Sequence, residues 1–234
     1  MPSASAVLQL VRWPNALIAA AGVLLGAWWG SGHLGWRSGV AALAAIALAA
    51  AANAWNDVAD VAIDARAHPE RPLPSGRLSV AGAARIARTM GAAALPLAAL
   101  ARPALGLLTI PVLALMRLYS PHLKRRGLPG NIVVAVLASL PFLYGAWAEG
   151  APGAGLRLVA IAAPLHFARE IAKDLDDAAG DAGARATLAL RAPGVARGAL
   201  VCAVLLFVAL LAPVALPVPH FALALVPAIF VCGL

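Results

Sequence analysis

Charged side chains are scarce in this sequence, and that scarcity excludes an ordinary soluble domain. Only 12% of the 234 residues are charged, whereas 62% are hydrophobic and the mean hydropathy is +0.87. Cysteine is scarcer still, because Cys202 and Cys232 are the only two. Both lie in apolar segments without the spacing of a metal or redox site. We interpret them as packing or lipid-facing residues.

Runs of about 20 apolar residues, each long enough to cross a bilayer, make up most of the chain. We place them near residues 7–30, 36–58, 80–101, 103–120, 129–148, 154–173, 194–216 and 218–234. The predicted fold is all-α, a polytopic membrane helical bundle of about eight transmembrane helices. We expect one domain over residues 1–234, incomplete at its C-terminus because the last run is short. No signal peptide is expected, since the first run is long and contains Arg12 and Asn15.

The positive charges lie mainly on one side of this predicted bundle. A net charge of +8 would suggest nucleic acid as a partner for a soluble protein, but the placement of the charges argues against it. All Lys and Arg except Arg37, Arg102 and Arg157 fall at the N-terminus or in and beside the second, fourth and sixth connections. By the positive-inside rule these parts are cytoplasmic. All acidic residues except Glu149 lie on the same side, so we expect a site that opens to the cytosol of a bacterial-type inner membrane.

A polar stripe ends the second apolar run. Taken as a helix, residues 53–64 place Asn53, Asp57, Asp60 and Asp64 within about 60° of one another, with Asn56 on the flank. Three carboxylates this close repel one another unless a positive charge lies among them. Carboxylate oxygens are ligands of Mg²⁺. In proteins this ion is usually bound by one or two carboxylates together with substrate phosphates. A solvated, charged helix end is the alternative for this stripe taken alone.

A second stripe repeats the first. Glu170, Asp174, Asp177 and Asp181 have the same successive spacings of four, three and four residues, and they also end an apolar run. Lys173 takes the place of Asn56, and Asp176 points to the opposite side. The repetition predicts that the two stripes belong to paired halves that face one site.

Two cytoplasmic connections carry the cations that such a site needs. Residues 65–79 contain three prolines, which prevent a helix, and Arg71 lies close to the first stripe. Such a loop could clamp an anion, or it could merely set topology. Lys124, Arg125 and Arg126 in the next cytoplasmic connection could neutralise phosphate oxygens or contact lipid headgroups. Asn15 lies deeper in the first run, where an amide side chain without a hydrogen-bond partner costs free energy. We therefore expect Asn15 to line a cavity.

Carboxylates, cations and a large apolar interior suit one kind of substrate, a diphosphate attached to a lipid chain. Mg²⁺ and the cations would neutralise the charge that develops on the diphosphate as its bond to carbon breaks. An apolar pocket would protect the allylic carbocation from water. A membrane carrier is the first alternative, but its carboxylates would lie near the midplane rather than at helix ends. A lipid-binding accessory protein would need no matched acidic stripes.

Four segments resemble the UbiA superfamily of intramembrane prenyltransferases. They are NDVADVAIDARAHPERPLPSGRLS at residues 56–79, REIAKDLDDAAGD at 169–181, YSPHLKRRGLPGN at 119–131 and RWPN at 12–15. The first two resemble the aspartate-rich motifs of the family, especially in geranylgeranylglyceryl-phosphate prenyltransferases. The resemblance covers residues 10–234 and implies a helical bundle around a central cavity. The family usually has about nine such helices.

The resemblance also implies a prenyl diphosphate donor, Mg²⁺ as cofactor and a lipophilic or aromatic acceptor that remains unidentified. It assigns metal and diphosphate binding to Asn56, Asp57, Asp60, Asp64, Asp174, Asp177 and Asp181. Asp60, Asp64, Asp174 and Asp177 are the expected catalytic carboxylates. The expected substrate contacts are Asn15, Asn53, Asn56, Arg71, Lys124, Arg125 and Lys173. A catalytically silent relative that binds prenyl lipids is a further alternative.

Overall fold

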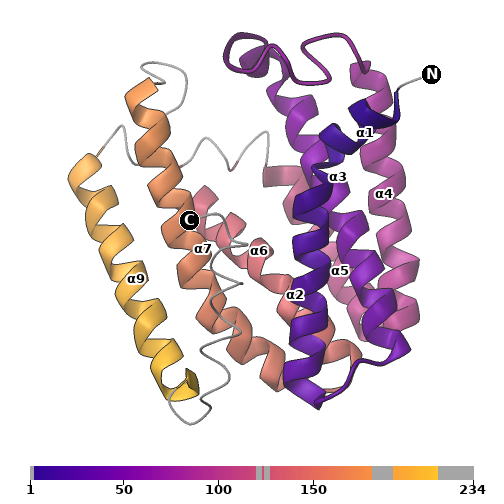
Figure 1. Cartoon of the computed structure of the whole chain (residues 1–234), viewed down its shortest axis with the longest axis vertical. Helices are drawn as coiled ribbons and strands as arrows, with labels where there is room; N and C mark the ends of the chain where they lie inside the picture. Colours follow the sequence, from indigo (N-terminus) through magenta and orange to yellow (C-terminus); the bar gives the residue numbers. More distant parts are fainter. Residues whose placement is uncertain (1–2, 120–122, 124–126, 181–191, 216–234) are drawn as a thin grey trace. The chain divides into compact units, whose positions relative to one another are not determined.

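The structure is a computed structural model that describes residues 3–119, 123, 127–180 and 192–215, without the side chains of 176–180 and 212–215 (Figure 1). The described ranges form helices and no strands, so the all-α prediction is confirmed. The eight helices are α1 (Ala4–Val11), α2 (Trp13–Ser31), α3 (Trp36–Ala67), α4 (Val80–Ala101), α5 (Pro103–Leu118), α6 (Leu128–Ala148), α7 (Pro152–Gly180) and α9 (Pro193–Ala215). The predicted run at 218–234 lies outside the described residues.

Contacts within the chain divide it into two compact units. The first unit consists of Met1–Lys124 and Leu140–Leu156, and it contains α1 to α5 with the C-terminal part of α6. The second unit consists of Arg125–Ser139 and Arg157–Leu234, and it contains the N-terminal part of α6, most of α7, and α9. In the second unit α7 and α9 lie side by side (Figure 1), and buried Ile171 packs with Ala196 between them.

Three helices in the described part of the chain are long and apolar enough to cross a membrane by length and composition. They are α3, α6 and the Pro193–Leu211 part of α9. The bent pair α1 and α2 meets the same test together, and α5 is a shorter apolar helix of 16 residues. The first predicted run, 7–30, is therefore divided at Arg12 by a bend of 51°. Helix α3 continues beyond the predicted end at 58 to Ala67, so the first acidic stripe is helical throughout.

Glycines on α2 and α6 let these two helices approach closely within the first unit. A Cβ on Gly26 would lie 2.1 Å from the Phe142 carbonyl oxygen, and one on Gly145 would lie 1.7 Å from the Val23 carbonyl oxygen. Gly22 also faces α6, at Pro141. Small residues spaced four apart let membrane helices pack closely. Such packing contacts matter because the hydrophobic effect does not drive helices together within lipid.

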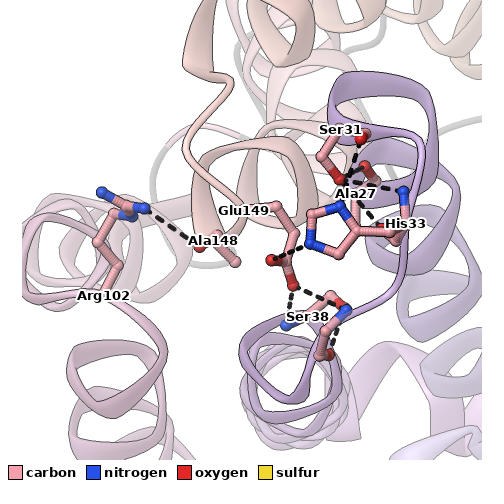
Figure 2. Close-up of polar contacts among 8 residues, drawn as sticks. Ala27, Ser31, His33, Ser38, Arg102, Ala148 and Glu149 are labelled. Atoms are coloured by element: carbon pink, nitrogen blue, oxygen red, sulfur yellow. Dashed lines mark hydrogen bonds and ion pairs between the residues drawn. The ribbon is translucent and has the colours of Figure 1, made fainter.

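Glu149 holds the amino end of α3 in the same unit (Figure 2). Gly35 at the N-cap has no side chain, and the Glu149 carboxylate accepts from the backbone N–H groups of Gly35 at 3.1 Å and Ser38 at 3.0 Å. His33 Nε2 lies 3.4 Å from the other carboxylate oxygen. A carboxylate at a helix amino end satisfies unpaired N–H groups and complements the helix dipole. We call this arrangement the Glu149 cap.

Candidate functional site

The first acidic stripe is buried at the carboxyl end of α3. Asp57, Asp60 and Asp64 are only 4%, 6% and 2% exposed, whereas Asn53 and Asn56 are half-buried. Buried carboxylates persist as ions only where cations or hydrogen-bond donors are fixed beside them. The solvated helix end considered for this stripe is therefore excluded.

Two arginines supply the positive charge. Arg12 Nη2 lies 2.8 Å from Asp57 Oδ1, and Arg71 Nη1 lies 2.8 Å from Asp64 Oδ2. Both guanidinium groups are about one-third exposed, so each reaches from the surface to a buried carboxylate. The second oxygen of Asp64, Oδ1, is buried with no hydrogen-bond partner among the described residues. A buried acceptor without a donor is costly, and a bound cation would satisfy it.

The backbone of Arg12 forms an elbow between α1 and α2. Its φ of 49° and ψ of 61° are left-handed, and it is the one residue other than glycine with positive φ in the described ranges. Pro14 at the start of α2 suits a helix beginning, and Asn53 Nδ2 donates to the Val11 carbonyl oxygen at 3.0 Å. The left-handed conformation costs about 1–2 kcal/mol for such a residue, and contacts with the polar stripe of α3 hold it in place.

The loop at residues 68–79 brings Arg71 to the stripe, as the sequence predicted. Backbone bonds from Ser75 N to Arg71 O and from Leu78 N to Pro72 O close its turns. Leu73 and Leu78 are buried with Leu10 of α1 in one apolar cluster. The loop and α1 are thus packed together beside the aspartates.

A cavity of about 350 Å³ lies among these elements. Its lining residues come from α1, the elbow, α3 and the loop: Gln9, Arg12, Asp57, Glu70, Arg71, Pro72 and Arg77. Arg77 donates to the Glu70 carbonyl oxygen and to Ser75 Oγ at 3.1 Å. The cavity therefore has three guanidinium groups in its wall, which suits an anionic ligand.

The second acidic stripe begins on α7, in the second unit. Asn131 Nδ2 of α6 donates to Asp174 Oδ2 at 3.0 Å, and Arg169 pairs with Glu170 at 3.0 Å. Lys173 is exposed. Asp177 lies in α7 but its side chain is outside the described residues, as are Asp181, Lys124 and Arg125. That the two stripes face one site remains a prediction.

Among the described residues, no three or more His, Cys, Asp or Glu side chains are placed together so that they could hold a metal ion. The first stripe nevertheless suits Mg²⁺ chemically, because it offers carboxylate oxygens and the unpaired Oδ1 of Asp64. Asn15 is exposed near the start of α2, where its predicted role in a cavity stays a prediction.

Six residues near these stripes were not among the predicted site residues. Asn131 donates to Asp174, and the other five line the cavity: Gln9, Arg12, Glu70, Pro72 and Arg77. The sequence had indicated no role for Arg12 at the site, although this residue belongs to the RWPN segment. The sequence signal for a helix break at Arg12 was the Trp-Pro pair at residues 13–14, because proline favours the first turn of a new helix. An asparagine at the start of an apolar segment was the corresponding signal for Asn131.

The chain resembles known proteins along most of its length. The model of the UbiA prenyltransferase family matches residues 15–234. Digeranylgeranylglyceryl phosphate synthase of Methanoculleus marisnigri is 35% identical over 187 residues, which is 78% of this chain and 67% of that protein. The synthase of the same name from Ignicoccus hospitalis is 37% identical over 225 residues, 89% of this chain and 72% of that protein.

Solved structures share the fold. A structure of a digeranylgeranylglyceryl phosphate synthase has a TM-score of 0.78 at 24% identity and covers 91% of this chain and 78% of that one. A UbiA homologue from Archaeoglobus fulgidus, bound to GPP and Mg²⁺, has a TM-score of 0.73 at 21% identity. The match covers 97% of this chain and 83% of the homologue's chain. At these identities the likeness concerns the fold.

Proposed function

Because the chain belongs to the UbiA prenyltransferase family, we propose that it transfers a prenyl group from a prenyl diphosphate to a lipophilic acceptor, with Mg²⁺ as cofactor. One observation carries the proposal beyond family membership. At the polar end of apolar α3, two buried carboxylates each hold an arginine beside a cavity with a cationic wall. This arrangement suits a ligand that brings cations and phosphate oxygens together.

The proposed reaction breaks the bond between the allylic carbon and the diphosphate oxygen, and the electron pair leaves with the oxygen. An electron pair of the acceptor then forms the new bond to that carbon, and the proton that the acceptor loses passes to the departing diphosphate. Asn56, Asp57, Asp60 and Asp64 would hold Mg²⁺ on one side, and Asp174, Asp177 and Asp181 on the other. Bound Mg²⁺ would neutralise charge that develops on the leaving group. Arg71, Lys124 and Arg125 would donate to phosphate oxygens, and the apolar helices would keep water from the carbocation.

Several finer features belong to the same proposal. Homologues named digeranylgeranylglyceryl phosphate synthase favour an acceptor that is itself a lipid, and they leave its identity in this chain open. Asn15, Asn53 and Lys173 would contact substrate. The positive-inside rule supports a cytoplasmic N-terminus and a site that opens to the cytosol. A silent relative that binds prenyl lipids without reaction is the alternative, and it would share these binding residues.

The acceptor can be found by mass spectrometry of lipids. Membranes that contain the protein, supplied with geranylgeranyl diphosphate and Mg²⁺, are expected to yield a new lipid heavier by one geranylgeranyl group than its precursor. Control membranes without the protein should lack it, and EDTA should abolish its formation. Product formation in EDTA would contradict the cofactor assignment, and bound donor without any product would favour the silent relative.

Arg71→Lys tests how the donor is held. Lysine keeps the charge but not the planar fork that grips two oxygens. A charge-assisted hydrogen bond is worth roughly 1.5–3 kcal/mol, so we expect geranyl diphosphate to bind about tenfold to a hundredfold more weakly. Titration of purified protein in Mg²⁺ gives the affinity.

The matched control is Arg77→Lys, because Arg77 lines the same cavity but donates to the loop itself. We expect it to change the affinity for geranyl diphosphate by less than about threefold. Equal affinities of the wild type and Arg71→Lys would leave the loop as a topology signal only.

A further inference from the structure

Arg12 and a divalent cation would need the same carboxylate. Asp57 is among the residues proposed to hold Mg²⁺, and its Oδ1 accepts a hydrogen bond from Arg12 Nη2 at 2.8 Å. The Asp57 side chain is 6% exposed, so few directions of approach remain open. Two cations that converge on one buried carboxylate repel each other strongly, because the local dielectric constant is low. A metal ion at Asp57 should therefore bind more weakly while the guanidinium stays beside this carboxylate than after it has moved away.

The surroundings of Arg12 offer the guanidinium another partner. Arg12 lines the cavity, and its side chain is one-third exposed. A diphosphate in this cavity would present oxygens to Arg12 as well as to Arg71. The guanidinium could then exchange a carboxylate for a phosphate within the cavity.

The elbow makes this exchange easier to accommodate. The left-handed backbone of Arg12 lies at the junction of α1 and α2, where a change in the conformation of this residue interrupts no helical hydrogen-bond ladder. Strained residues of this kind cluster at switch regions and ligand clamps. Asn53 of α3 also donates to the Val11 carbonyl oxygen, beside the elbow.

We propose that Arg12 is an exchangeable counter-ion of Asp57, which competes with a divalent cation for the carboxylate until a diphosphate ligand draws the guanidinium away. The inference rests on the proposed function, because it takes a diphosphate as the ligand of the cavity. Metal and donor then bind cooperatively, and by linkage each strengthens the other by the same factor.

The test measures metal binding rather than turnover. Mn²⁺ replaces Mg²⁺ and is titrated by electron paramagnetic resonance, with and without geranyl thiolodiphosphate, whose carbon–sulfur bond resists ionisation. In the wild type we expect the analogue to tighten Mn²⁺ binding about tenfold or more. In Arg12→Gln we expect Mn²⁺ alone to bind about tenfold more tightly than in the wild type, and the analogue to add less than about threefold.

Two further variants keep the test decisive. Arg12→Gly removes the guanidinium and tolerates a positive φ, so it replaces Arg12→Gln if the glutamine variant folds poorly. Arg66→Gln removes an equal charge from an exposed residue of α3 that lies about 180° from Asp57 around the helix, and it should leave Mn²⁺ affinity within about twofold.

Each remaining outcome has a definite meaning. Unchanged Mn²⁺ affinity in both Arg12 variants would overturn the inference, while tightening by the analogue in the wild type would still support the proposed function. An equal effect of Arg66→Gln would assign the change to the general field of the protein and would also overturn the inference. Absence of Mn²⁺ binding in the wild type under both conditions would overturn the metal assignment and the inference together.

Discussion

Asp64→Asn is expected to lower turnover by about 10²–10³-fold while the protein still inserts and folds. Asparagine keeps the shape of the side chain but removes the charge that a metal ion requires. It also leaves Arg71 without its 2.8 Å carboxylate partner. Because Arg71 is one-third exposed, water can solvate the released guanidinium, and the loss of stability should be modest.

The measurement is product formation per folded molecule, with the folded fraction taken from size-exclusion chromatography in detergent. Asp176→Asn is the matched control, because the sequence places Asp176 on the side of its helix away from the second stripe. It should stay within about twofold of wild-type turnover. Wild-type turnover by Asp64→Asn would remove this carboxylate from the proposed metal site.

Gly145→Ala is expected to have the largest effect on stability. The new Cβ would lie 1.7 Å from the Val23 carbonyl oxygen and 2.8 Å from the Ala27 nitrogen, both in the backbone of α2. Backbone atoms cannot rotate away as a side chain can, so the two helices must separate. Overpacking typically costs about 1–3 kcal/mol, and more where backbone must shift. We expect Tm to fall by about 5–10 °C or more in detergent.

Gly39→Ala separates this contact from general effects of glycine. A Cβ on Gly39 meets no atom within 4 Å, and the residue lies inside α3. Alanine there should be neutral or stabilising by up to about 1 kcal/mol, since glycine is the poorer helix former. Thermal unfolding followed by tryptophan fluorescence compares the two variants. A Tm of Gly145→Ala equal to that of the wild type would contradict the close approach of α2 and α6.

Hydropathy and helical periodicity predicted the features that depend on neighbours in sequence. Apolar length placed the helices, and helix α4 has the predicted bounds of 80–101. The period of the α-helix placed Asp57, Asp60 and Asp64 on one buried stripe, and three prolines predicted the loop that carries Arg71.

Features that depend on distant parts of the chain could not be predicted in this way. The pairing of Arg12 with Asp57 spans 45 residues, and that of Asn131 with Asp174 spans 43. No periodicity encodes such contacts, because they follow from how whole helices pack. The elbow at Arg12 was missed for a related reason. Hydropathy averages over a window and does not register one residue in a left-handed conformation.

The Glu149 cap has a consequence for the order in which the chain is built. Glu149 follows Gly35 by 114 residues, so α3 is synthesised long before the carboxylate that completes its amino end. Until the turn after α6 emerges, water or lipid headgroups must satisfy those first N–H groups. The amino end of α3 is therefore finished late during membrane insertion, although α3 is among the first helices translated. A nascent chain released before residue 149 would retain an unfinished helix end.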